Sequence, residues 1–119
     1  MLFRSGIEAS KELIFESGVD IESCRLTAEK IKNTPGVSAV VATTDIMAAG
    51  IMSAFKDMGI RIPGDISIVG YDDTALSRVL TPRLTTIRQD MRLKAGVAAG
   101  RILAMIKGDG ALEVVLELV

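Results

Sequence analysis

The chain has 119 residues, of which 49% are hydrophobic, 24% are charged and only 3% are aromatic, and its formal net charge is −1. A chain of this length has room for one hydrophobic core, built here from aliphatic side chains rather than from large rings. The near-neutral charge argues against a nucleic-acid-binding surface on these residues.

The lack of histidine, the single cysteine and the lack of long apolar runs exclude further classes of function. The chain has no histidine, which removes the commonest general base and the usual transition-metal ligand, so we expect no catalytic residue, metal or cofactor. The single cysteine, Cys24, cannot form an internal disulfide, and we expect an inert thiol on the buried face of a helix. Residues 1–5 are too short for a signal peptide, and no apolar run approaches the ~20 residues of a membrane span. We therefore expect a soluble, cytoplasmic protein without membrane contact.

The first part of the chain predicts a strand, a helix and a second strand. Residues 12–15 form a short apolar run between Ser-Gly loop signals, which is typical of a strand. Asp20 is placed to cap a helix that Pro35 ends, because proline cannot continue a helix. The apolar residues of this helix recur at helical spacing: Ile21, Cys24, Ala28 and Ile31. Residues 37–42 are an almost continuous apolar run, as expected of a buried parallel strand.

The middle of the chain predicts a second helix and a third strand. Residues 43–45 end the preceding strand with polar groups and offer a helix N-cap, for which Asp45 is the main candidate. A helical stripe follows, and Gly59 supplies its C-terminal stop. The members of the stripe are Met47, Ile51, Ala54, Phe55 and Met58. Residues 62–65 then predict a turn, and residues 66–69 predict a buried strand.

The last part of the chain predicts an irregular stretch, a helix and a final strand. Residues 76–82 are typical of a loop, and residues 85–87 of an extended segment. Asp90 can cap a third helix that Gly108 ends. Its apolar residues face one way: Ala95, Ala98, Ala99, Ile102, Met105 and Ile106. Residues 112–118 show the two-residue period of a half-exposed strand.

Strands and helices alternate along the whole chain, which predicts the α/β class: a three-layer, mostly parallel sheet with flanking helices. The sequence begins in a loop that leads at once into a strand, and it stops within the last predicted strand. We therefore expect residues 1–119 to form one incomplete lobe, truncated at its N-terminal side. An unpaired sheet edge in such a lobe favours self-association, so we expect a dimer or a larger assembly, for which domain swapping is one route.

Two adjacent carboxylates follow the strand predicted over residues 66–69. In open α/β sheets ligands bind beyond the carboxyl ends of the strands, where Asp72 and Asp73 would lie. In an extended backbone these two side chains point to opposite sides, so one can reach a cleft while the other caps a turn. Capping by both is the alternative interpretation. Thr44 closes the preceding strand, and Gln89 follows the extended segment; both can hydrogen-bond a polyhydroxylated ligand.

Three motifs in order, residues 39–50, 59–73 and 80–90, resemble the lactose-repressor/galactose-repressor (LacI/GalR) family. The resemblance covers essentially the whole chain from Gly6 onward. It implies a transcriptional repressor that carries a helix-turn-helix headpiece, a hinge helix and two periplasmic-binding-protein-like lobes around an effector cleft. The present chain would be most of the second, C-terminal lobe, without the DNA-binding headpiece. DNA would then be contacted only through that headpiece.

The resemblance also implies roles for individual residues. Asp72 resembles the ligand-contacting aspartate of the family, Gln89 a cleft residue, and Thr44 a position with a polar ligand contact. Ala49 and Leu80 fall on the surface through which family members dimerise. The implied effector is a sugar or another small metabolite. The aromatic ring that often stacks on the effector near residues 18–19 has no counterpart here.

Two other functions remain open at this point. The first is a lobe of a sugar-binding protein of a transport system, which shares the same fold. The second is a small enzyme of flavodoxin-like architecture with Asp72 or Asp73 as general base, for which the chain offers no histidine or activated nucleophile.

Overall fold

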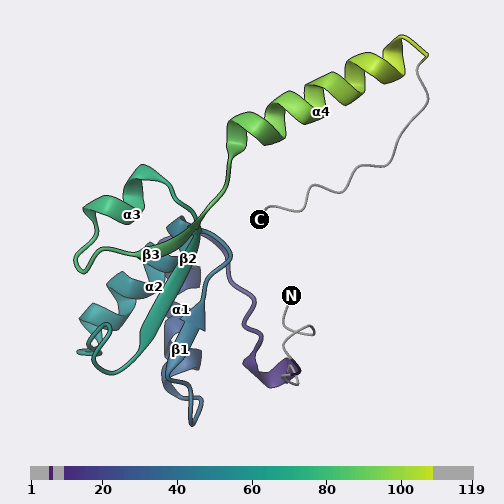
Figure 1. Cartoon of the computed structure of the whole chain (residues 1–119). Helices are drawn as coiled ribbons and strands as arrows, with labels where there is room; N and C mark the ends of the chain where they lie inside the picture. Colours follow the sequence, from purple (N-terminus) through teal and green to yellow (C-terminus); the bar gives the residue numbers. More distant parts are fainter. Residues whose placement is uncertain (1–5, 7–9, 109–119) are drawn as a thin grey trace. The chain divides into compact units, whose positions relative to one another are not determined.

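The computed structural model of the chain describes residue 6 and residues 10–108 (Figure 1). These residues form two compact units, one ending at Ile87 and the other beginning at Arg88, and each is described by itself. The strand predicted over residues 112–118 lies outside the described residues.

The first helix, α1, spans Ile21–Lys32 and confirms the predicted one. The Asp20 carboxylate accepts a hydrogen bond from the backbone N–H of Ser23 at 2.9 Å, which satisfies one of the donors left unpaired at a helix start. Cys24, Ala28 and Ile31 are buried as predicted. Ile21 is 87% exposed, because the first residue of the helix lies ahead of the part that packs.

The sheet of the first unit consists of β1 (Ala39–Val41), β2 (Ser67–Asp72) and β3 (Thr85–Arg88), in that spatial order. β1 and β2 are parallel, with Val41 opposite Val69. Side chains alternate between the faces, so Ile66 and Ile68 are buried while Ser67 and Val41 are exposed. One face of the sheet therefore contributes to the core of the first unit, which confirms an α/β sheet flanked by helices.

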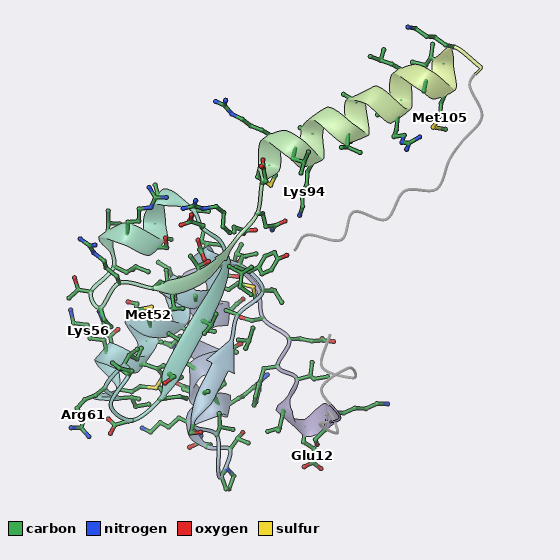
Figure 2. The ribbon with its side chains drawn as sticks, in the orientation of Figure 1. Glu12, Met52, Lys56, Arg61, Lys94 and Met105 are labelled. Atoms are coloured by element: carbon green, nitrogen blue, oxygen red, sulfur yellow. The ribbon has the colours of Figure 1, made fainter. Side chains whose placement is uncertain are left out.

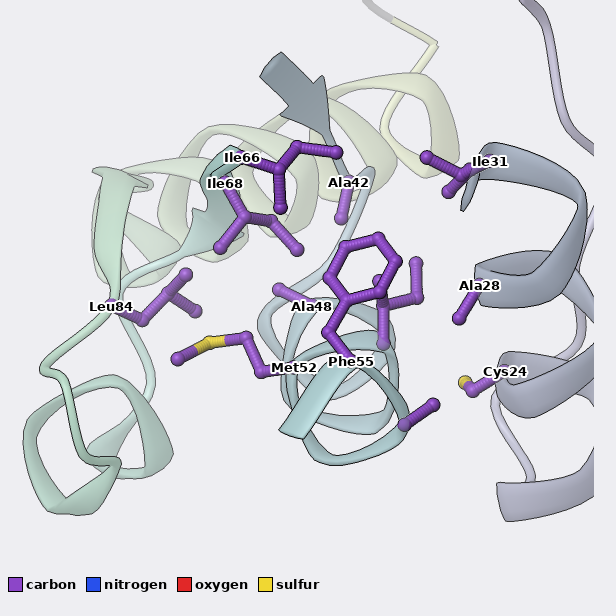
Figure 3. Close-up of a cluster of buried hydrophobic side chains, with 12 residues drawn as sticks. Cys24, Ala28, Ile31, Ala42, Ala48, Met52, Phe55, Ile66, Ile68 and Leu84 are labelled. Carbon is purple, nitrogen blue, oxygen red and sulfur yellow. The ribbon is translucent and has the colours of Figure 1, made fainter. Parts of the chain in front are cut away.

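The second helix, α2, spans Asp45–Asp57, packs on β2, and carries α1 on its other side. The fully buried ring of Phe55 lies at the centre of the core, between side chains of α1 and side chains of the sheet (Figure 3). Gly59 follows the helix with a φ of +72°, the left-handed conformation that a glycine stop requires, as predicted. The other buried residues of the core carry no aromatic ring, and partly buried Phe15 packs against them.

Two predicted elements of the first unit are wrong. Residues 12–15 do not form a strand; a short 3₁₀ turn, η2, covers Lys11–Leu13, and the Ser10 hydroxyl caps it. Ile14 is exposed and pairs with no strand among the described residues, so the apolar run lacked the neighbour that a strand needs. The predicted loop over residues 76–82 contains a short helix, α3 (Ala75–Val79).

α3 forms because Ser77 satisfies the backbone on both of its sides. Its N–H and its hydroxyl both donate to the carbonyl of Thr74, at 3.1 and 2.8 Å, and its own carbonyl accepts from the N–H of Leu84 at 2.9 Å. Ser77 is buried, which is a tertiary property that the local sequence pattern does not reveal.

The second unit contains α4 (Met91–Ile106), which confirms the third predicted helix. The Asp90 carboxylate caps it by accepting from the N–H of Leu93 at 2.9 Å, and Gly108 follows its end with a φ of +84°. The apolar stripe predicted for this helix is not part of a core among the described residues, since none of the side chains of α4 is buried there.

Candidate ligand-binding site

The candidate site lies at the carboxyl ends of β1 and β2. The last ladder contact of β1 is the bond from the Ala42 N–H to the Val69 carbonyl, at 2.8 Å. Beyond it the chain leaves the sheet toward α2, so Thr44 follows the carboxyl end of β1, while Asp72 is the last residue of the neighbouring parallel strand β2. The two predicted contact residues of the first unit thus belong to neighbouring strand tips at one edge of the sheet, where open α/β sheets bind ligands.

Thr44 is the N-cap of α2, and its hydroxyl oxygen accepts a hydrogen bond from the N–H of Met47 at 3.3 Å. The prediction that Asp45 caps this helix is therefore wrong; Asp45 is the first helical residue. A capping hydroxyl still has its hydrogen, so half-buried Thr44 can donate to a ligand while it holds the helix start.

Asp72 and Asp73 do not continue an extended backbone as the sequence predicts. Their φ angles are +117° and +52°, values that non-glycine residues rarely adopt and that occur at functional sites. The Asp73 carboxylate turns toward α3, where it lies 3.4 Å from Arg78 Nη2 and 3.5 Å from the Ser77 hydroxyl. Asp73 is therefore part of the scaffold of α3, and half-buried Asp72, which is not a core residue, is the candidate ligand contact.

Sequence reasoning missed the main polar residue of this region, Asp45. Its side chain is fully buried, and its carboxylate accepts hydrogen bonds from the N–H and the hydroxyl of Thr74, at 2.7 and 2.9 Å, and from the hydroxyl of Thr86. An aspartate directly after a strand reads as an ordinary cap. The one local signal was Gly70, because a glycine within a strand often marks a place where another part of the chain lies close to the backbone.

Gln89 belongs to the second unit, directly after β3. Its side-chain oxygen accepts a hydrogen bond from the ammonium group of Lys94 on α4. Lys94 is labelled in Figure 2. The structure describes Gln89 within its own unit, so its proposed contact with a ligand stays a prediction.

Ala49 and Leu80, the two predicted dimer-interface residues, line one groove of the first unit. This groove has a volume of about 670 Å³ and runs between α2 and the segments before β2 and after α3. Its lining combines apolar side chains with two cations, and three of its members are labelled in Figure 2. The side chains that line it include Ala49, Met52, Lys56, Ile60, Arg61, Ile62, Val79 and Leu80.

Other kinds of site find no support in the described part of the chain. Within it, no three cysteine, aspartate or glutamate side chains are grouped so that they could hold a metal ion. Burial raises the pKa of the Cys24 thiol, so this side chain stays protonated at neutral pH and behaves as a small apolar residue. None of the helices described is long and apolar enough to cross a membrane.

Residues 5–118 match the family of periplasmic binding protein-like domains. The HTH-type transcriptional regulator GalR of Escherichia coli (strain K12) is 38% identical to the chain over 109 residues, which cover 87% of this chain and 31% of GalR. The chain belongs to the LacI/GalR family. The lactose operon repressor of the same organism is 44% identical over 72 residues, or 60% of this chain and 20% of the repressor.

A solved structure of a family regulator, CelR in complex with cellobiose, superimposes with a TM-score of 0.79 at 25% identity, over 92% of this chain and 34% of CelR. The chain thus spans about a third or less of the length of these relatives. All three are transcriptional regulators and not enzymes, in agreement with the prediction of a non-catalytic effector domain of the LacI type. Regulators of this family bind small effectors such as sugars.

Proposed function

We propose that the chain forms most of the second, C-terminal lobe of the effector-binding domain of a cytoplasmic LacI-type repressor, and that it binds a sugar without catalysis. The observation that supports this proposal is that Thr44 follows β1 and Asp72 ends the adjacent parallel strand β2, in a chain of this family. The relatives are regulators, which favours a repressor over a sugar-binding protein of a transport system.

The chemistry of the edge suits a polyhydroxylated ligand. The Asp72 carboxylate accepts hydrogen bonds from sugar hydroxyls, and charge-assisted bonds of this kind are roughly twice as strong as neutral ones. The Thr44 hydroxyl can donate and accept, so it can match a ligand hydroxyl that does either. CelR, which is similar in structure, is in complex with cellobiose. Since residues 18–19 carry no aromatic ring, we expect hydrogen bonds rather than stacking to dominate recognition.

The lobe acts through linkage. An effector that binds between two lobes stabilises one arrangement of them, and the coupling free energy changes the affinity of the whole regulator for DNA. In this proposal the DNA is contacted by a headpiece outside the 119 residues, and the chain contributes one wall of the effector cleft. It also contributes the dimerisation groove with Ala49 and Leu80, which would hold a second copy of the chain.

The direct test is calorimetric titration of the 119-residue chain with galactose, lactose and cellobiose. We expect at least one of these sugars to bind, and Asp72→Asn to weaken its binding about tenfold to a hundredfold, because a hydrogen bond to a charged group contributes roughly 1.5–3 kcal/mol. Asparagine tolerates the positive φ of residue 72, so this substitution removes the charge and keeps the backbone.

Asp57→Asn is the matched control, since Asp57 is an exposed carboxylate at the far end of α2, and we expect it to leave binding unchanged. Absence of binding by every sugar, or equal affinities of the wild type and Asp72→Asn, would contradict the proposal.

A further inference from the structure

The Asp45 carboxylate connects three segments that lie far apart in the sequence. It sits at the first position of α2 and is fully buried. One of its oxygens accepts from the N–H and the hydroxyl of Thr74, beyond the tip of β2, and the other accepts from the hydroxyl of Thr86 on β3. A buried carboxylate is costly unless hydrogen bonds compensate for lost hydration, and these three donors, together with the N-terminus of α2, do so.

The backbone of β2 is shaped to admit this carboxylate. A Cβ atom at Gly70 would lie 2.5 Å from Asp45 Oδ1 and 2.8 Å from Leu84 Cδ2, closer than real Cβ atoms approach other atoms. The carboxylate therefore occupies the space over residue 70 that a side chain would otherwise fill. The glycine in the strand and the buried aspartate depend on each other: any side chain at residue 70 would clash with the Asp45 carboxylate.

Thr86 extends the network to the candidate ligand contact. Because its hydroxyl hydrogen is donated to Asp45, its oxygen is available as an acceptor, and it accepts from the backbone N–H of Asp73 at 3.3 Å. The N–H groups of Asp73 and Thr74 are thus both held, one through Thr86 and one directly by Asp45. These amides flank the left-handed turn at Asp72 and Asp73 that sets the direction of the Asp72 side chain.

We propose that Asp45 is a positioning residue for ligand binding, which acts through Thr86 and Thr74 to hold the tip of β2 in its left-handed conformation. This inference rests on the proposed function, because it assigns to the network the presentation of Asp72 to a sugar. A non-glycine residue keeps a positive φ only where surrounding contacts stabilise it. The hydrogen bonds of the Asp45 network supply that stabilisation here.

Thr86→Val tests the proposal, because valine keeps the shape of threonine and loses both the donor and the acceptor. We expect amide hydrogen exchange at Asp73, measured by NMR on the full 119-residue chain, to accelerate about tenfold, the scale of one lost hydrogen bond. Exchange at Ser67, whose N–H donates to Ser38 at the opposite end of β2, should stay within about twofold. Calorimetry with cellobiose as the probe should show about tenfold weaker binding.

Two further variants sharpen the test. Thr86→Ser keeps the hydroxyl, so it should restore both the slow exchange at Asp73 and the affinity for cellobiose. Thr85→Val makes the same chemical change at the exposed neighbouring position of β3 and should alter neither.

Unchanged exchange at Asp73 in Thr86→Val would overturn the proposal, and so would equal acceleration at Asp73 and Ser67, which reports general destabilisation. Accelerated exchange with unchanged cellobiose affinity would overturn the positioning role. If no sugar binds the wild type, the proposed function fails, while the exchange data still decide whether Asp45 and Thr86 hold the tip of β2.

Discussion

A single ion pair closes the turn that leads into β2. The Asp65 carboxylate accepts from the backbone N–H of Arg61 at 2.8 Å and from its guanidinium at 2.6 and 3.0 Å. These bonds lower the pKa of Asp65 from its ordinary value of 3.8 to about 2, with the guanidinium as the main cause and the backbone N–H next. The sequence predicted a turn over residues 62–65, and the ion pair explains why it is well formed at neutral pH.

The pKa of Asp65 gives a pH-dependent prediction. Because this pKa is lower in the folded chain, the ion pair contributes stability above about pH 3.8 and loses it as the pH falls through about 2. Arg61→Met should raise the pKa of Asp65 toward 3.8 without reaching it, since the N–H of residue 61 still donates. NMR titration of the carboxyl carbon measures the shift, and Arg83→Met, which removes an exposed arginine elsewhere, is the control. A pKa that stays near 2 in Arg61→Met would contradict this account.

At the scale of elements, the contact between α1 and α2 depends on a small residue. Cys24 on α1 faces Gly50 on α2, and a Cβ atom at residue 50 would lie 2.5 Å from Cys24 Sγ and 2.7 Å from its Cβ. The second of these atoms belongs to the base of the side chain, so a rotamer change cannot relieve the clash and the helices must separate. The core around Phe55 lies beside this contact, so separation would also loosen its packing.

Gly50→Ala is therefore expected to reduce the free energy of unfolding by about 1–3 kcal/mol, the usual cost of overpacking a well-packed core, measured by urea denaturation. Gly96→Ala in α4 is the matched comparison, because a Cβ atom there meets nothing within 4 Å among the described residues. Alanine favours a helix over glycine by about 1 kcal/mol, so this second substitution should increase the helicity of α4. A destabilisation by Gly96→Ala equal to that of Gly50→Ala would contradict the steric explanation.

At the scale of the whole molecule, two surfaces of the first unit compete for a second copy of the chain. One is the groove of about 670 Å³ with Ala49, Val79 and Leu80. The other is the side of β1 that carries Val41, which is 75% exposed among the described residues. Exposed apolar side chains of either kind favour association. The family resemblance points to the groove. The sequence argument predicts association through an unpaired sheet edge, and β1, which carries Val41, is one of the two edge strands of the described sheet.

Light scattering on purified variants distinguishes the two surfaces. We expect the wild type to be a dimer, and we expect Leu80→Asp and Val79→Asp to be monomers, because a carboxylate would be desolvated in the interface. Val79 is 74% exposed, so its substitution leaves the core intact and guards against a folding defect in Leu80→Asp. Val41→Asp is the control at an equally exposed valine. Dissociation by Val41→Asp with a persistent dimer in Val79→Asp would place the contact on the sheet instead.

Local signals in the sequence were sufficient to predict the three longer helices, α1, α2 and α4. Asp20 and Asp90 cap α1 and α4 as predicted, and Gly59 ends the region of α2 with the expected left-handed φ. Caps and stops work this way because they satisfy backbone groups within a few residues, so the sequence window contains all the partners. The strand predicted over residues 66–69 was also readable from its apolar run, whereas the run over residues 37–42 gave a strand, β1, that is not buried on both sides as predicted, since Ala39 and Val41 are exposed.

Contacts between segments far apart in the sequence determined the features that the sequence analysis missed. Residues 12–15 have the composition of a strand, but a strand exists only beside another one, and the described chain provides no neighbour. α3 depends on burial of Ser77 against the segment of Leu84. The left-handed turn at Asp72 depends on Asp45, 27 positions earlier, and on Thr86, which follows on β3. Backbone strain and buried charge are tolerated only when partners from elsewhere in the fold compensate for them. A local sequence pattern does not contain those partners, so it cannot predict the strained turn or the buried carboxylate.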